Sequence, residues 1–171
     1  MTANRIPPQD AADVLRRLGL IPLDGEGGNF IRTYEHRTVL PDGRKLASAI
    51  YYLLAGEERS AWHRVRGADE LWFAHGPTAA VQMIVAPDGR DWSIRRLRAL
   101  PGPDFQPQAT VPADCWQCTR LIDPGPARWS LFSTVVTPEF RAVDFELQTA
   151  TGLLALNPRL AAALREFESA V

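Results

Sequence analysis

The sequence predicts an all-β domain, a sandwich or a barrel, with a short helix at each end. A chain of 171 residues suits one domain that can bury a sizeable core. Between residues 28 and 147, short runs rich in β-forming residues are separated by turn signals, among them Pro-Asp-Gly at residues 41–43 and 87–89. About nine short strands at regular spacing favour a sandwich or barrel over a parallel α/β sheet.

The predicted elements start and finish with a helix. Pro8 suits the first turn of a helix over residues 8–18, and Gly19 is a natural stop. The expected strands cover residues 29–37, 46–54, 61–65, 70–73, 79–85, 92–97, 115–121, 129–137 and 143–147. Asn157 is the expected N-cap of the closing helix, and Pro158 fits its first position. The apolar stripe of that helix would consist of Leu160, Leu164 and Phe167.

The composition argues against two classes of partner. Hydrophobic residues make up 46% of the chain and charged residues 23%, as in an ordinary globular protein. The formal net charge of -1 gives no basic excess for binding nucleic acid or an anionic membrane. No apolar run approaches the roughly 18 residues that would span a bilayer. The N-terminus also lacks the apolar core of a signal peptide, so we expect a cytoplasmic protein.

The two cysteines, Cys115 and Cys118, form a Cys-x-x-Cys motif. This spacing can belong to a redox pair or to half of a zinc site. A redox pair sits at a helix start, whereas these residues lie in a predicted strand, where positions three apart point to opposite faces. No second cysteine or histidine pair completes a zinc site. We therefore expect two structural thiols.

The most informative stretch covers residues 60–76, where His63 and Glu70 are seven apart across a short turn. This spacing resembles the first cupin motif, His-x-His-x4-Glu, with Val65 at the second histidine. Residues 111–117 resemble the second motif, Pro-x-Gly-x-x-His, with Asp114 at the glycine and Gln117 at the histidine. A metal would thus find one imidazole, one carboxylate and one weak amide donor. Transition metals usually need two or three strong donors, so we expect no resident cofactor; a divalent metal is the alternative.

Without a metal, His63 and Glu70 suit acid–base catalysis. Imidazole titrates near neutrality, and a neighbouring carboxylate can fix its tautomer and raise its basicity. The structural alternative is a hydrogen-bonded pair that only closes the barrel. A barrel of this size holds one small ligand, so inward polar and aromatic side chains are candidates for binding it. The expected substrate-binding residues are Glu26, Asn29, Arg32, Tyr34, Trp62, Trp72, His75 and Gln117.

For two of these candidates the sequence leaves the orientation or the partner of the side chain open. His75 falls on the opposite parity to Glu70, unless a bulge near Ala74 turns it inward. Arg32 could bind a carboxylate or phosphate of a ligand, or pair with Glu26 or Glu70 instead.

Several segments, in order, resemble one family of the cupin superfamily, the cupin-five family. They are Leu-Gly-Leu at 18–20, Glu-Gly-Gly-x-Phe at 26–30, Ser-x-Trp-His-Arg-Val at 60–65, Asp-Glu-x-Trp at 69–72 and Asp-Phe-Glu-Leu at 144–147. The resemblance implies a double-stranded β-helix, the jelly-roll cupin barrel, with short N- and C-terminal helices. It further implies a single domain over residues 1–171 with a core at about 26–148, a homodimer, and a ligand site lined by His63, Glu70, Gln117 and the Glu-Gly-Gly strand.

A fold of this kind does not decide the reaction. The leading hypothesis is a metal-independent enzyme of the isomerase, epimerase, cyclase or lyase type that acts on a small molecule. His63 would be the general base or acid, and Glu70 would orient it or act as its partner. The alternatives are a metal-dependent dioxygenase or isomerase, and a cupin that binds a small molecule without catalysis.

Overall fold

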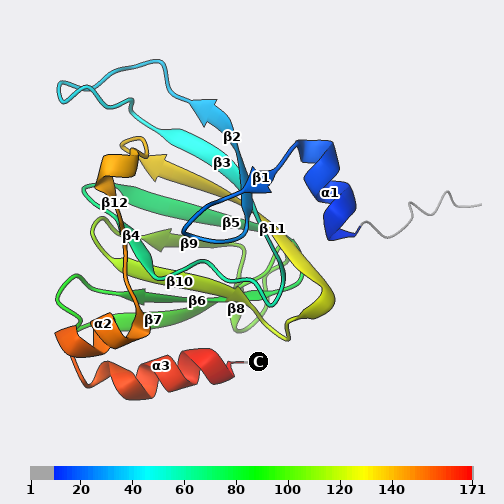
Figure 1. Cartoon of the computed structure of the whole chain (residues 1–171), viewed down its shortest axis with the longest axis vertical. Coiled ribbons are helices and arrows are strands. Elements are labelled where there is room, and N and C mark those ends of the chain that lie inside the picture. The colour runs from blue at the N-terminus through cyan, green and yellow to red at the C-terminus, as the bar shows by residue number, and fades with distance from the viewer. Residues whose placement is uncertain (1–9, 171) are drawn as a thin grey trace, which may run out of the picture.

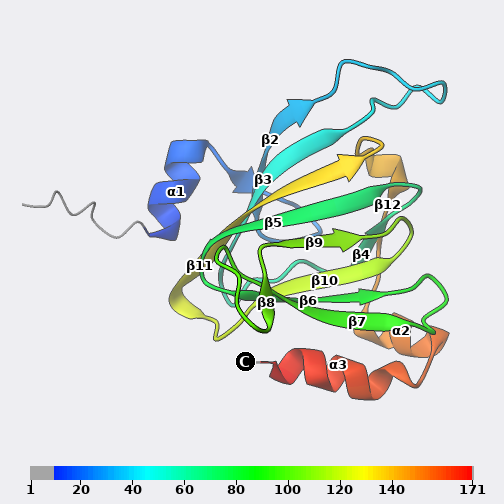
Figure 2. The same cartoon turned by 180° about the vertical axis from the view of Figure 1, so that it is seen from behind.

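The computed structural model describes residues 10–170, which form two six-stranded sheets and short helices (Figures 1 and 2). The first sheet contains, in spatial order, β1 (Ile21–Pro22), β2 (Asn29–Glu35), β3 (Ser48–Gly56), β11 (Gly125–Thr137), β5 (Asp69–Pro77) and β9 (Gln108–Val111). The second contains β12 (Phe145–Leu147), β4 (His63–Val65), β10 (Trp116–Leu121), β6 (Ala80–Val85), β7 (Trp92–Leu97) and β8 (Phe105–Gln106). Neighbouring strands are antiparallel, apart from the parallel pair β7–β8. The predicted fold class, mostly β with short helices at both ends, is confirmed.

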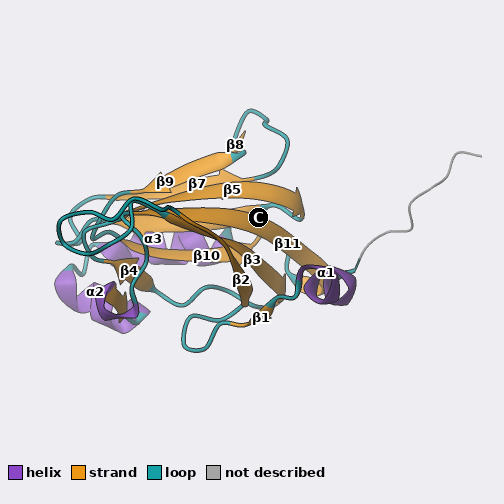
Figure 3. Cartoon of the chain, turned by 90° about the horizontal axis from the view of Figure 1, so that it is seen from above, coloured by secondary structure: helices purple, strands orange, loops and turns teal. Residues whose placement is uncertain are grey.

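Inward side chains from both sheets form the main core. Figure 3 shows the strands from above, with α1 beside the end of β11. Alternate residues of each strand point inward, which places Tyr52, Trp72 and Phe132 of the first sheet against Ile84 and Leu121 of the second. The indole of Trp72 lies edge-on between Tyr52 and Phe132, with ring centroids 5.6 Å and 5.5 Å away. Such contacts stabilise aromatic clusters beyond the area they bury.

The N-terminal helix α1 (Ala11–Leu18) covers the outer face of the first sheet, where Val14 packs near Leu53 and Trp129. The side chain of Asp10 caps its first turn by accepting a hydrogen bond from the backbone N–H of Asp13. The helix stops at Gly19, as predicted, in the left-handed conformation that glycine adopts without strain. Residues 8 and 9 of the predicted helix lie outside the described residues.

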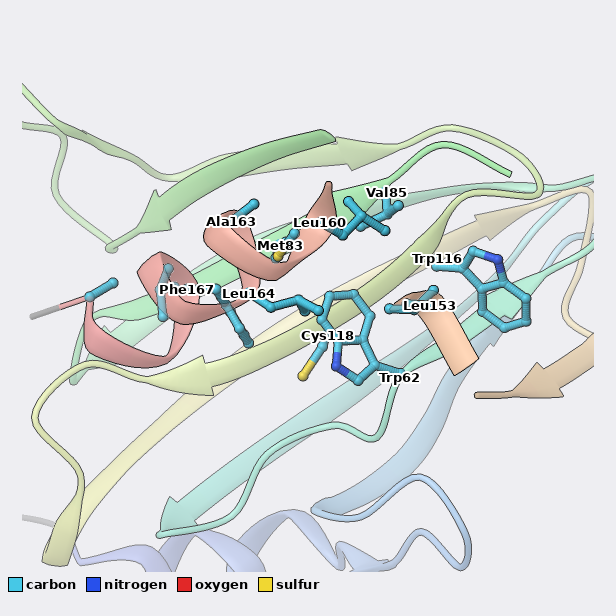
Figure 4. Close-up of a cluster of buried hydrophobic side chains, with 12 residues drawn as sticks. Trp62, Met83, Val85, Trp116, Cys118, Leu153, Leu160, Ala163, Leu164 and Phe167 are labelled. Carbon is cyan, nitrogen blue, oxygen red and sulfur yellow. The ribbon is translucent and has the colours of Figure 1, made fainter. Parts of the chain in front are cut away.

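Two C-terminal helices, α2 (Ala150–Leu156) and α3 (Leu160–Ser169), cover the outer face of the second sheet (Figure 4). The predicted stripe of α3 is buried there against β6 and β10. The prediction of Asn157 as the N-cap was wrong: it is the C-cap of α2, a helix that the sequence reading missed. The N-cap of α3 is instead Arg159, and the Asn157 side chain accepts a hydrogen bond from the backbone N–H of that residue.

The nine predicted strands are all present, with ends shifted by up to four residues. The last of them is shorter than expected, because a 3-10 turn, η1 (Ala142–Asp144), precedes it. The missed strands β1, β8 and β9 have only two to four residues each. Cys118 packs in the outer cluster and Cys115 against the inner core, and both thiols are free. Over residues 10–170, no helix has the length and apolar character to cross a membrane.

Candidate functional site

A cavity of about 340 Å³ opens between the two sheets beside β4 and β12. Strands β2, β3, β5 and β11 form one wall, and His63, Val65 and Phe145 form the other. Most of the lining is apolar or aromatic. Its ionisable members are Asp24, Glu26, Arg32, Tyr52, His63 and Glu70. An apolar cavity with a few converging polar groups is typical of a small-molecule site.

His63 lies on β4, and its side chain is only 2% exposed. Its Nδ1 atom is 2.8 Å from the backbone oxygen of Ala61. We assign the proton to Nδ1, because a carbonyl oxygen can only accept. The Nε2 lone pair then faces the cavity, 3.8 Å from Glu26 Oε1. Burial lowers the pKa of His63 and outweighs the opposing effect of Glu70, so the imidazole is neutral at pH 7.

Glu70 is held on β5 by a chain of amides. The Gln117 side chain donates a hydrogen bond to Glu70 Oε2, and its oxygen accepts one from Gln82 Nε2 at 3.1 Å. Gln117 is itself the cross-strand partner of His63, which brings the two predicted motifs together. Burial raises the pKa of Glu70, while the nearby His63 and the Gln117 hydrogen bond lower it.

Glu26 reaches the cavity from the tight turn between β1 and β2. Gly27 and Gly28 have φ values of +93° and +69°, and a Cβ on Gly27 would lie 2.7 Å from the backbone oxygen of Arg59. Only glycine allows the turn to lie so close to the neighbouring chain. Ala61 N donates to the backbone oxygen of Glu26 at 2.6 Å, which fixes the turn beside β4. Burial raises the pKa of the Glu26 carboxyl to about 8.

Other predicted binding residues have different positions. Trp72 lines the cavity, and its Nε1 is buried with no hydrogen-bond partner among the described residues. Arg32 stands at the cavity mouth with its charge paired to Glu35, 2.8 Å away, rather than to Glu26 or Glu70.

The remaining candidates do not line the cavity, and neither does Gln117, which contacts Glu70 behind it. Trp62 points to the outer face, 5.8 Å from the Phe167 ring, because neighbouring residues of a strand face opposite ways (Figure 4). Tyr34 is 50% exposed, beyond a bulge in β2, and Asn29 at the start of β2 does not line the cavity. The pairing of β5 with β11 does shift register at His75, near Ala74, but His75 still points outward, with its Nε2 2.7 Å from Ser133 Oγ.

Sequence reasoning missed the aromatic residues that close the cavity. Phe145 packs against the His63 imidazole, with ring centroids 5.3 Å apart, and Phe140 packs against Phe145. The predicted strand at 143–147 could have indicated Phe145 as an inward residue. Alternation along the strand places Phe145 on one face and the polar residues on either side of it on the other face. What the pattern did not give was the pairing of β12 with β4, which sets Phe145 opposite Val65.

The donor set does not fit a tightly held metal. Val65 supplies no donor, and the Gln117 oxygen is engaged by Gln82 rather than aimed at the cavity. Within residues 10–170, no three His, Cys, Asp or Glu side chains are grouped as metal ligands. Acid–base chemistry by His63 and its carboxyl neighbours is the chemistry that this arrangement supports.

Comparison with known proteins identifies the family. The sequence profile described as "Cupin superfamily (DUF985)" matches residues 12–148. The chain belongs to this cupin family. This cupin is similar to a protein of Shewanella oneidensis solved by X-ray crystallography, with 30% identity, a TM-score of 0.81, and coverage of 96% of this chain and 100% of that one.

Two further solved structures share its fold. A hypothetical protein from Leishmania major has 24% identity and a TM-score of 0.79, over 92% of this cupin and 98% of that chain. A dTDP sugar isomerase from Desulfovibrio desulfuricans has 13% identity and a TM-score of 0.52, over 78% of this cupin and 83% of that chain. At such low identity these likenesses concern the fold alone. No curated protein matches the sequence.

Proposed function

We propose that this cupin is a small-molecule enzyme of the isomerase, epimerase, cyclase or lyase type, which uses acid–base residues without a resident metal. The observation that carries the proposal is the state of His63: buried, neutral, and fixed by Ala61 so that the Nε2 lone pair faces an apolar cavity. A histidine kept only to fill the core would be expected to have a protein partner on both nitrogens.

The other groups have complementary roles. His63 Nε2 accepts a proton from the substrate as general base. Glu70 lies close enough to favour the imidazolium that then forms, while Gln117 keeps the carboxyl in place. The Arg32 guanidinium at the mouth supplies donors for polar groups of the substrate, and the Trp72 ring forms part of the apolar wall.

We also propose the finer architecture that the family resemblance implies. The two sheets would form the double-stranded β-helix of a jelly-roll barrel, within one domain over residues 1–171, and two copies would associate in the cytoplasm. The end-to-end match to the Shewanella oneidensis structure supports the single domain. Light scattering on the purified protein tests the homodimer, which a monomer mass would contradict.

Turnover of an extracted metabolite pool tests the function. The wild-type protein and His63→Ala are each incubated with a small-molecule extract, and the products are followed by mass spectrometry and NMR. The wild-type protein should convert at least one metabolite. His63→Ala and Glu70→Gln should lose most of this conversion, whereas His36→Ala, a change outside the cavity, should keep it.

Three results would contradict the proposal. Full conversion by His63→Ala would remove the assigned base. A metabolite that raises the melting temperature without being consumed would indicate the non-catalytic binding protein. Elemental analysis that finds a stoichiometric metal in freshly purified protein would favour the metal-dependent enzyme instead.

A further inference from the structure

We propose that Glu26 is a second catalytic residue, a proton donor that protonates the carbonyl oxygen of the substrate while His63 deprotonates the neighbouring α-carbon. The matching substrate is an enolisable carbonyl compound with an apolar body. The inference rests on the proposed function and deepens it, because it assigns the acid, the base and the type of proton transfer.

One residue, Ala61, fixes both groups. Its N–H donates to the backbone oxygen of Glu26 at 2.6 Å, and its own oxygen accepts from His63 Nδ1 at 2.8 Å. The Tyr52 hydroxyl holds the same turn by donating to the Gly27 oxygen at 2.9 Å. As a result, Glu26 Oε1 and His63 Nε2 lie 3.8 Å apart on one side of the cavity. Active sites gain much of their rate from such fixed geometry.

The surroundings of Glu26 favour its neutral form. Its carboxyl is 13% exposed, and no described residue donates a hydrogen bond to it. The nearest guanidinium along the cavity wall, that of Arg32, is paired with Glu35 at the mouth. His63, the neighbour at 3.8 Å, is neutral as well. A buried carboxyl without a cation keeps its proton, and can therefore give it away.

A neutral acid beside a neutral base matches the needs of enolisation. His63 Nε2 takes a proton from the α-carbon, and the electrons of that C–H bond form the C=C bond. The electron pair of the carbonyl π bond takes the proton from Glu26. The products are the enol, an imidazolium and a carboxylate, so charge and protons balance. The new ion pair forms between adjacent groups, which stabilises it in an apolar cavity.

The separation of the two groups also restricts the reaction. Atoms 3.8 Å apart on one wall reach the α-carbon and the carbonyl oxygen from the same face of the substrate. Inversion of a carbon centre by this pair alone would need an acid and a base on opposite faces. The rings of Trp72, Tyr52 and Phe145 line the cavity and provide apolar walls for the body of the substrate.

Hydrogen–deuterium exchange on two defined ketones tests the inference. Phenylpyruvate and phenylacetone share an apolar ring and an activated CH2 group, and only the first carries a carboxylate. Loss of the CH2 signal in D2O near neutral pD is followed by proton NMR. The wild-type protein should accelerate exchange of at least one ketone over buffer. Glu26→Gln and His63→Ala should each reduce this acceleration by about 100-fold or more, in the range of acid–base catalysis.

Glu57→Gln is the matched control, because it makes the same chemical change on an exposed residue. It should keep the full rate. Exchange that is lost in His63→Ala and kept in Glu26→Gln would overturn the role of Glu26 and leave the proposed function intact. Failure of the wild-type protein to accelerate either ketone would overturn the substrate class, while the metabolite-pool experiment still judges the proposed function separately.

Discussion

Replacement of Glu26 by glutamine should remove a loss of stability that the wild-type protein suffers as the pH rises from about 5 to 8. Burial raises the pKa of this carboxyl from 4.5 to about 8. Above pH 4.5 the unfolded chain releases a proton that the folded protein retains. Rising pH therefore lowers the free energy of unfolding, and this loss of stability stops growing above pH 8. Glutamine has the shape of the neutral acid and does not titrate, so the variant escapes this loss.

The two pKa values set the size of the effect. Each pH unit within the window costs the wild-type protein up to about 1.4 kcal/mol of unfolding free energy. Relative to Glu26→Gln, it should lose about 2.5 kcal/mol between pH 5 and pH 7, and about 3.5 kcal/mol by pH 8. For a domain of this length, 2.5 kcal/mol corresponds to a melting temperature roughly 5–10 °C lower.

Urea unfolding at pH 5, 6, 7 and 8 measures the difference, with Glu57→Gln as the control for a lost surface charge. His63 and Glu70 titrate in both proteins, so the comparison isolates Glu26 together with its coupling to these two neighbours. A difference that stays constant from pH 5 to pH 8 would refute the reasoning. So would a wild-type protein that gains stability over the variant as the pH rises, because Glu26 would then be ionised and favourably paired in the folded state.

Three other predictions follow from the same geometry. A pH–rate profile should show two limbs. At low pH the rate should fall as His63 is protonated, and this limb should lie below the ordinary imidazole range because burial lowers the pKa of His63. Near pH 8 the rate should fall again as Glu26 ionises. Gly27→Ala should lower the melting temperature and the catalytic rate together, because its Cβ would lie 2.7 Å from the Arg59 oxygen and displace the turn that carries Glu26. Val65→His should add a second imidazole to the cavity and raise zinc or nickel uptake, measured by elemental analysis against the wild-type protein.

The sequence predicted the parts of the site that depend on local periodicity. Alternation along one strand placed His63 and Val65 on the same face, and the spacing of the two motifs brought Glu70 and Gln117 to the same region. The same rule would have excluded Trp62, whose parity is opposite. Long-range backbone contacts could not be predicted in this way. The hydrogen bond from Ala61 to Glu26 joins residues 35 positions apart, and no periodic pattern encodes it.

Helix ends show the same limit. Gly19 ends α1 because a left-handed cap is a local property of glycine. Asn157 has the side chain of a good N-cap, but α2 precedes it and its amide also donates to the oxygen of Gly89. Tertiary contacts therefore decided where α3 begins, over the local preference of the Asn-Pro sequence.

The weak set of metal donors and the protonation states of the cavity are consistent with each other. Val65 replaces a histidine donor with an apolar wall, and Gln117 replaces another with a neutral amide that binds Glu70. Each change removes a ligand and also removes a cation, bound or protonated, that would have stabilised ionised carboxyls. What remains is a cavity in which burial raises the pKa of Glu26 and Glu70 and lowers that of His63. A neutral acid and a neutral base in one apolar cavity are the states that the proposed proton transfer requires at pH 7.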